Sequence, residues 1–260
     1  MPADDASQLP AHRDGPRLRD TLGRLLHVVD STRAVCATVS AHFIDLDPAS
    51  ASRVGPDDLV TMVVEAASAG EAPIGPLRYR AEDPRFQVSA DGHTAWATTE
   101  REPGVVDLIG VFDITPTRVS VGASRYGWIP GAGHVPSHLL LPDLEAMVAE
   151  LRVYASRRAL ATGYTGRVHV TTAVFCDIPD TPIVLRRLDE ATGELLPDGE
   201  AVQEVEPFEA VYSMADSSWE VRRHVYALAS RMATRFGASA PQFLADPDGG
   251  CDDDTPEFLI

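Results

Sequence analysis

A helical pattern of apolar residues begins at Pro142, in the second half of the chain. Pro142 suits the first turn of a helix, because its missing N–H is not needed there, and Gly163 suits the left-handed residue that ends one. The apolar residues between them recur every three or four positions and therefore share one face. They are Leu144, Met147, Val148, Leu151, Tyr154 and Ala155. Arg152, Arg157 and Arg158 follow toward the C-terminal end, where cations suit the helix dipole. The pattern predicts a helix with a buried apolar face, which contributes on the order of 10 kcal/mol.

After this helix the apolar residues alternate with polar ones, which is typical of half-buried strands. Strands are predicted at Arg167–Phe175, Pro182–Leu188 and Ala210–Met214, with Pro182–Leu188 returning beside Arg167–Phe175. Ser217 and Glu220 have the spacing of a capping box, and they begin a helix that ends at Gly237. The sequence therefore predicts a module of helix, antiparallel strands and helix over residues 139–240.

The first half of the chain also combines helical and alternating patterns. Helices are predicted at 18–29 and 56–70, and strands at Ala34–Leu46, Val105–Ile114 and Arg118–Ala123. Ala34–Leu46 fits a helical period as well, and its β-branched residues favour the strand. Asp91-Gly92, between two short alternating segments, indicates a tight β-hairpin. These elements predict an α+β half with a β-meander over residues 15–123.

The expected fold class is α+β, with antiparallel sheets covered by helices in two linked halves. A glycine- and proline-rich stretch at 124–138 is the predicted connection between the halves. Residues 1–14 are polar and are predicted to be disordered, and residues 241–260 form an acidic tail.

Charge and composition exclude several kinds of function. The chain of 260 residues carries a net charge of −17, and all 22 of its basic residues are arginine. The absence of lysine excludes a phosphate-loop lysine, a Schiff-base lysine and a catalytic lysine. The negative charge disfavours binding to nucleic acid and to anionic membranes. No apolar run approaches the ~20 residues of a membrane helix. The three cysteines have no paired spacing, which favours reduced thiols and a cytoplasmic location.

The histidines and serines do not form a recognisable catalytic or metal-binding motif. His134 and His138 are four residues apart, but Pro136 lies between them, so a shared helical face is not expected. We therefore predict no metal, no cofactor and no catalytic residue. A hydrolase that uses Ser124, His138 and His169 together with His134 is kept as a third alternative.

Three arginine pairs in the 139–240 module are candidates for an anion site, because guanidinium groups match phosphate and carboxylate. They are Arg157-Arg158, Arg186-Arg187 and Arg222-Arg223. Solvated side chains that pair with nearby carboxylates are the competing explanation. A nucleotide- or nucleic-acid-binding module is therefore the second functional hypothesis.

The acidic tail suggests contact with another protein. From Gln242 onward the chain has six acidic residues and no basic one, yet it ends in three apolar residues. The candidate docking residues are Asp252, Asp253, Asp254, Phe258, Leu259 and Ile260. Our leading hypothesis is a non-enzymatic, cytoplasmic interaction or regulatory module that binds another protein through its acidic surface or tail.

The region from His93 to Leu244 resembles the C-terminal accessory portion of actinobacterial Schlafen/AlbA-like proteins. The resemblance lies in the helix end Ala155–Ala161 with its double arginine, in Gly163 and the strand that follows, and in the closing helix Val225–Gly237. The nucleic-acid-binding part of that family, with its acidic-Phe-Lys type of motif, is not found in this sequence. The resemblance implies an accessory or recognition module and transfers no functional residue.

Overall fold

The structure is a computed structural model. It describes residues 35–51, 61, 86–88, 93–102, 105–125, 128–129, 133–134, 138–176, 180–189, 191–192, 194–203 and 205–249. The predicted helices at 18–29 and 56–70 lie outside these residues, apart from Thr61, as do residues 1–14 and 250–260.

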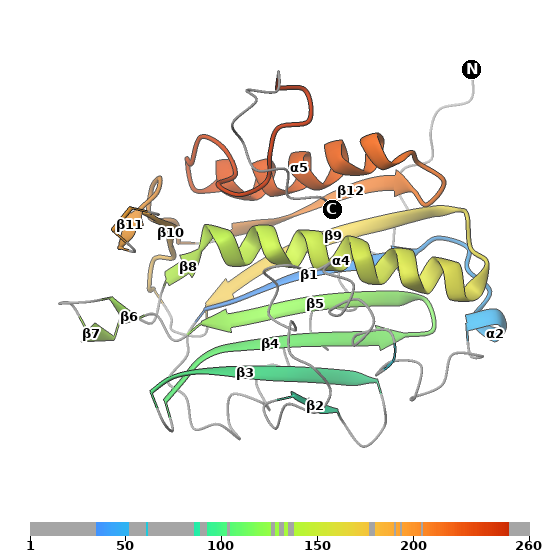
Figure 1. Cartoon of the computed structure of the whole chain (residues 1–260), viewed down its shortest axis with the longest axis horizontal. Coiled ribbons are helices and arrows are strands. Elements are labelled where there is room, and N and C mark those ends of the chain that lie inside the picture. The colour runs from blue at the N-terminus through green and yellow to red at the C-terminus, as the bar shows by residue number, and fades with distance from the viewer. Residues whose placement is uncertain are drawn as a thin grey trace.

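A seven-stranded antiparallel sheet is the largest element that the structure describes (Figure 1). Its strand order is β12-β9-β1-β5-β4-β3-β2. The strands are β1 (Val35–Phe43), β2 (Phe86–Val88), β3 (Thr94–Glu102), β4 (Val105–Thr115), β5 (Arg118–Arg125), β9 (Arg167–Cys176) and β12 (Val205–Ser213). The antiparallel pairing predicted on either side of Asp91-Gly92 is confirmed by β2 and β3, whereas Asp91 and Gly92 themselves lie outside the described residues. Within the ambiguous segment Ala34–Leu46, residues Val35–Phe43 form strand β1, as the β-branched residues predict.

Strands from both predicted halves join in this one sheet. β1, from the first half, pairs with β5 on one side and with β9, from the second half, on the other. Phe43 lies opposite Val168, and Ala41 lies opposite both Val119 and Val170. The α+β class with antiparallel strands covered by helices is confirmed, and β1 links the two halves into a single core.

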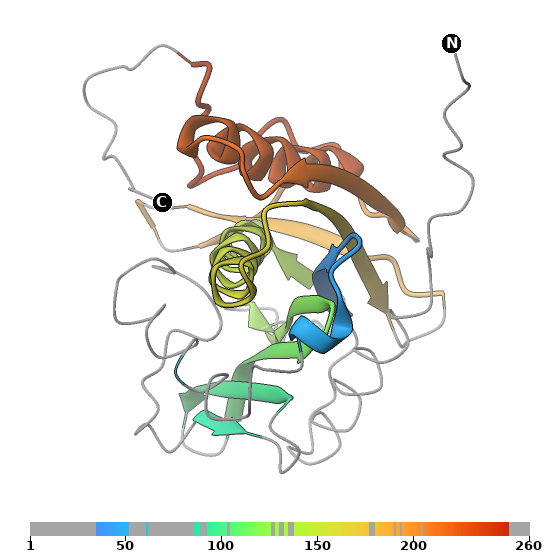
Figure 2. The ribbon, with the colours of Figure 1, turned by 90° about the vertical axis from the view of Figure 1, so that its right-hand side faces the viewer.

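Two long helices cover one face of the sheet (Figure 2). Helix α4 (Leu141–Thr162) packs against β5 and β1, and α5 (Ser218–Arg235) lies beside α4 at the β12 edge. The predicted capping box is confirmed, since Ser217 Oγ accepts from Glu220 N at 3.3 Å and Ser217 N donates to Glu220 Oε2 at 2.8 Å. A short helix, α2 (Pro48–Ala51), follows β1. Within the described part of the chain, no helix has the length and apolar composition needed to cross a membrane.

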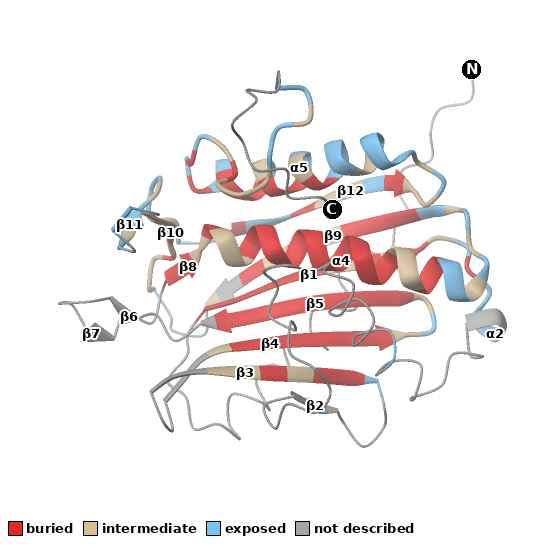
Figure 3. Cartoon of the chain, in the orientation of Figure 1, coloured by how far each residue is buried: buried red, intermediate tan, exposed pale blue. Residues whose placement is uncertain are grey.

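Helix α4 is buried on nearly all sides over most of its length (Figure 3). Its predicted apolar face is buried against the sheet, as expected. Four charged residues of α4 are buried as well, namely Glu145, Glu150, Arg152 and Arg158. Little of the α4 surface remains for solvent, because α4 also packs against α5, β8 and β10, and Arg158 near its C-terminal end contacts the turn between β4 and β5. Each buried charge therefore needs a partner inside the protein.

A small second sheet lies at the N-terminal end of α4. It has the order β11-β10-β8 and consists of β8 (His138–Leu140), β10 (Val184–Leu188) and β11 (Leu195–Pro197). The prediction that Pro182–Leu188 returns beside Arg167–Phe175 is wrong, because β10 instead pairs in parallel with β8. Within the predicted connection 124–138, β6 (Trp128–Ile129) and β7 (Gly133–His134) form a two-stranded sheet.

A close backbone contact at Gly199 joins this region to the end of α5. Glu200 N donates to Phe236 O at 2.5 Å, and Gly199 has φ +82°. A Cβ atom at Gly199 would lie 1.7 Å from the Phe236 carbonyl oxygen. Gly163 also has a positive φ, of +66°, but a Cβ atom there would meet nothing within 4 Å.

Gly199→Ala is therefore expected to lower the free energy of unfolding by about 2 kcal/mol, from backbone strain plus displacement of the helix end. Gly163→Ala is the matched control and should cost only about 1 kcal/mol, because it adds the strain of a left-handed alanine without a clash. Urea unfolding of both variants measures the difference. Equal losses would contradict the close contact at Gly199.

Candidate functional site

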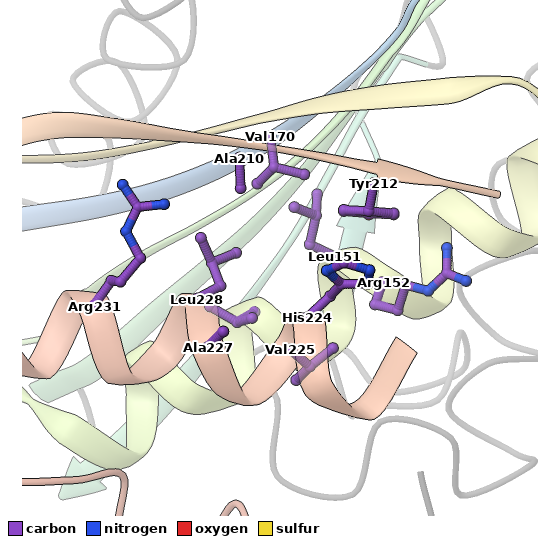
Figure 4. Close-up of a pocket in the computed structure, with 11 residues that line it drawn as sticks. Leu151, Arg152, Val170, Ala210, Tyr212, His224, Val225, Ala227, Leu228 and Arg231 are labelled. Carbon is purple, nitrogen blue, oxygen red and sulfur yellow. The ribbon is translucent and has the colours of Figure 1, made fainter. Parts of the chain in front are cut away.

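A pocket of about 200 Å³ lies between α4, α5 and the sheet (Figure 4). Its lining residues come from four elements. They are Val148, Leu151 and Arg152 of α4, Val170 of β9, Ala210 and Tyr212 of β12, and His224, Val225, Ala227, Leu228 and Arg231 of α5. The pocket combines apolar walls with a few polar groups, which is the usual composition of small-molecule sites.

Regular secondary structure positions these side chains. On α5, His224 and Arg231 are seven residues apart, which is two turns or about 10 Å along one helix face. Leu228 lies between them, so the pocket-facing side of α5 is basic, then apolar, then basic. On the sheet, Ala210 lies opposite Val170, and Tyr212 points to the same face as Ala210 because strand side chains alternate.

Arg152 is the most unusual residue of the pocket. Its exposed fraction is 9%, yet no carboxylate among the described residues lies within ion-pair distance of its guanidinium. Its Nη1 donates to the Met214 sulfur at 3.2 Å, its Cζ lies 5.1 Å from the centre of the Tyr212 ring, and its Nε has no hydrogen-bond partner. A thioether is a weak acceptor, so a nearly buried positive charge is left without a counter-ion.

Tyr212 and His224 stand beside Arg152. Their rings stack with centroids 5.7 Å apart and an interplanar angle of 27°, and His224 Nε2 lies 3.1 Å from Asp216 Oδ2. Burial raises the pKa of Tyr212, and the guanidinium of Arg152 opposes that rise only in part. The phenol therefore stays protonated at neutral pH and is available as a donor.

Arg231 lies on the same helix face as His224 and is solvent-exposed. Its Nη1 donates to the Glu209 carbonyl oxygen at 3.0 Å, and its Cζ lies 5.0 Å from the Phe208 ring centre. This arginine is already engaged and remains hydrated, so its charge acts on the pocket more weakly than that of Arg152.

The electrostatics of the pocket are opposite to those of the whole chain. The sequence has 39 acidic residues, yet none of them lines the pocket, whereas two arginines and a histidine do. No serine, threonine or cysteine lines it either, so the lining supplies no side chain of these nucleophile types. The arrangement is suited to binding an anion rather than to covalent catalysis.

The structure places the predicted arginine pairs at three separate locations. Arg158 is 2% exposed and donates to Thr115 O and Pro116 O, near the C-terminal end of α4. Arg187, near the other end of α4, pairs with Asp198 at 3.0 Å and donates to Ala240 O. These contacts are structural, and because the two arginines lie near opposite ends of α4 the pairs do not form one site.

The remaining arginines of these pairs also have other surroundings. Arg186 donates to His138 Nδ1 at 3.1 Å and to Leu195 O, and Arg157 is half-buried on α4. Arg222 is exposed on α5, and Arg223 pairs with Asp248 and lies over the Trp219 ring. Anion binding by any single pair stays a prediction.

The residues of the hydrolase alternative are not brought together. Ser124 donates to Val35 O at the start of β1, whereas His169 lies opposite His42 near the end of β1, about 23 Å along the strand. His169 Nε2 instead lies 3.0 Å from Glu209 Oε2. Burial, together with the charge of Arg186, lowers the pKa of His138 to about 4. Among the described residues, no three His, Cys, Asp or Glu side chains group as metal ligands do.

The first residues of the predicted acidic tail bind the body of the protein. The buried carboxylate of Glu145 accepts from the backbone amides of Gln242 at 2.5 Å, Phe243 at 2.7 Å and Leu244 at 3.0 Å. The side-chain amide of Gln242 also pairs with both main-chain groups of Leu188. The predicted docking residues Asp252, Asp253, Asp254, Phe258, Leu259 and Ile260 lie outside the described residues.

The pocket residues were not predicted from the sequence, although one signal for them exists. Arg152 directly follows Leu151 and lies four residues after Val148, so it borders the apolar stripe of α4. The predicted role of Arg152 at the C-terminal end of the helix dipole is wrong, because α4 runs from Leu141 to Thr162 and Arg152 lies in its middle. Arg231 lies on the predicted closing helix beside the Arg222-Arg223 pair, so it could be expected near an anion site if both helices cover one sheet face. Tyr212 carried no signal, because its place depends on the packing of α5 against β12.

Comparison with protein-family models, with curated proteins and with solved structures finds no match to this chain. The resemblance to Schlafen/AlbA-like accessory regions therefore stays a prediction.

Proposed function

We propose that this protein is a non-enzymatic binding module that takes a small anion in the pocket between α4 and α5. The observation that carries this proposal is Arg152, a nearly buried arginine that lines the pocket and has no carboxylate partner. An uncompensated charge in a protein interior costs several kcal/mol, and an anion in the pocket would offset that cost.

The size and charge of the pocket support a small ligand. A volume of about 200 Å³ is below the roughly 300–1,000 Å³ of pockets for drug-sized molecules, which favours a ligand smaller than a nucleotide. The net charge of −17 repels anions at long range, which makes a local concentration of basic side chains necessary for binding them.

The sequence predicts anion binding as the alternative to protein interaction, with paired arginines as its site. The pocket supports the same class of function with Arg152 in place of those pairs. A protein partner that binds the acidic surface or the tail stays a prediction, as does the cytoplasmic location.

The test is a thermal-shift screen of the full chain against small anions, including inorganic phosphate, acetate and benzoate. We expect at least one of them to raise the Tm, because a ligand at 100 times its Kd stabilises by about 2.7 kcal/mol. Arg152→Gln should abolish that shift, whereas Arg222→Gln, an exposed arginine of α5 outside the pocket, should keep it. The proposal fails if no anion gives a shift that depends on Arg152.

A further inference from the structure

We infer that the ligand is a monocarboxylate with a compact apolar body, such as an aromatic acid, which enters with its carboxylate toward Arg152. This inference rests on the proposed function and specifies its ligand class. Three features of the pocket carry it, namely the number of available cations, the type of donor and the shape of the apolar walls.

A single strong anchor favours one negative charge on the ligand. Arg152 is nearly buried and lacks a counter-ion, whereas Arg231 is exposed and already donates to the Glu209 carbonyl. His224 has its own carboxylate partner in Asp216. A second charge on the ligand would therefore face groups that are hydrated or already paired, and it would lose more solvation than it gains.

The available donors fit a carboxylate better than a phosphate. Phosphate sites in proteins draw on several main-chain amides, most often those of the first turn of a helix. The lining residues of α4 begin at Val148 and those of α5 at His224, both beyond the four free amides at each helix start. What remains is a planar guanidinium with a neighbouring phenol, and a guanidinium fork matches the two oxygens of a carboxylate.

The apolar walls select a compact body. Between the basic groups the pocket is lined by Leu151, Val170, Val225 and Leu228. The volume of about 200 Å³ corresponds to roughly seven water molecules at about 30 Å³ each, enough for a single ring with a carboxylate. The stacked rings of Tyr212 and His224 offer an aromatic ligand an edge or face contact beside the anchor.

Calorimetric titration of the full chain tests this inference, with benzoate, benzamide, terephthalate and inorganic phosphate as probes through the millimolar range. We expect benzoate to bind and benzamide, which has the same shape without the charge, to bind at least about tenfold more weakly. Arg152→Gln should raise the Kd for benzoate by at least about tenfold, whereas Arg231→Gln should change this Kd by less than about threefold.

A second variant guards against a folding defect in Arg152→Gln. Ala227 is exposed and lines the pocket, so Ala227→Phe narrows the pocket without entering the core. This variant should also bind benzoate more weakly. Unchanged benzoate binding in this variant would place the ligand elsewhere and overturn the inference.

The probes separate failure of the inference from failure of the proposed function. Arg152-dependent binding of phosphate without benzoate would overturn the monocarboxylate and leave the anion module standing. If terephthalate binds more tightly than benzoate, and does so through Arg231, only the claim that the ligand carries a single negative charge is overturned. Equal binding of benzamide and benzoate, or no binding of any probe, would overturn both.

Discussion

Arg152→Met is expected to raise the free energy of unfolding of the ligand-free protein by about 2–3 kcal/mol while it removes anion binding. Methionine keeps most of the apolar volume of the arginine stem and removes a nearly buried charge that has no carboxylate partner. A gain in stability together with a loss of function is the behaviour of a residue retained for a site. Urea unfolding, with benzoate titration alongside, measures both effects.

Arg158→Met is the matched control, because it makes the same substitution on the same helix. Arg158 is also buried, but it donates to the carbonyl oxygens of Thr115 and Pro116. Its removal loses two hydrogen bonds from a charged donor and should lower the free energy of unfolding by about 1–3 kcal/mol. A destabilised Arg152→Met protein would mean that the thioether and ring contacts of Arg152 outweigh its lost hydration.

Glu145→Ala is expected to produce the largest destabilisation, about 3–5 kcal/mol. The Glu145 side chain is fully buried and accepts from three consecutive backbone amides, those of residues 242–244. Alanine removes all three acceptor contacts and leaves a cavity, and each unsatisfied buried donor costs about 1–3 kcal/mol. Burial raises the pKa of Glu145, and these amides together with Arg187 oppose the rise.

Hydrogen exchange locates the effect of Glu145, because the amides of Gln242, Phe243 and Leu244 should become faster than those in the middle of β9. Glu145→Gln keeps one carbonyl acceptor and should therefore cost only about 1–2 kcal/mol. If Glu145→Ala stays within about 0.5 kcal/mol of the natural protein, the segment 242–244 is held by other contacts.

Much of the secondary structure follows from local patterns. Pro142 and Gly163 bound a helix that runs from Leu141 to Thr162, and the capping box at Ser217 and Glu220 begins α5 where the spacing predicts it. Such signals depend on a few neighbouring residues, so they survive whatever the rest of the chain does. The antiparallel pairing of β2 with β3 is confirmed for the same reason.

Strand pairing is less accessible from the sequence, because it joins residues far apart along the chain. The segment Pro182–Leu188 has a clear strand pattern, yet β10 pairs with β8 instead of β9. Alternation identifies a strand but does not select its neighbour. The pairing of β1 with β9, which unites the two predicted halves, likewise has no local signal.

The order of apolar and polar residues was enough by itself to determine most helices and strands that the structure describes, together with the α+β class. Only the tertiary structure decided that Arg152 is nearly buried beside a thioether and an aromatic ring while Arg158, six residues later, donates to two main-chain carbonyls. The physical reason is that helix propensity is a property of neighbouring residues. The environment of a buried charge depends instead on which distant strands and helices pack around it.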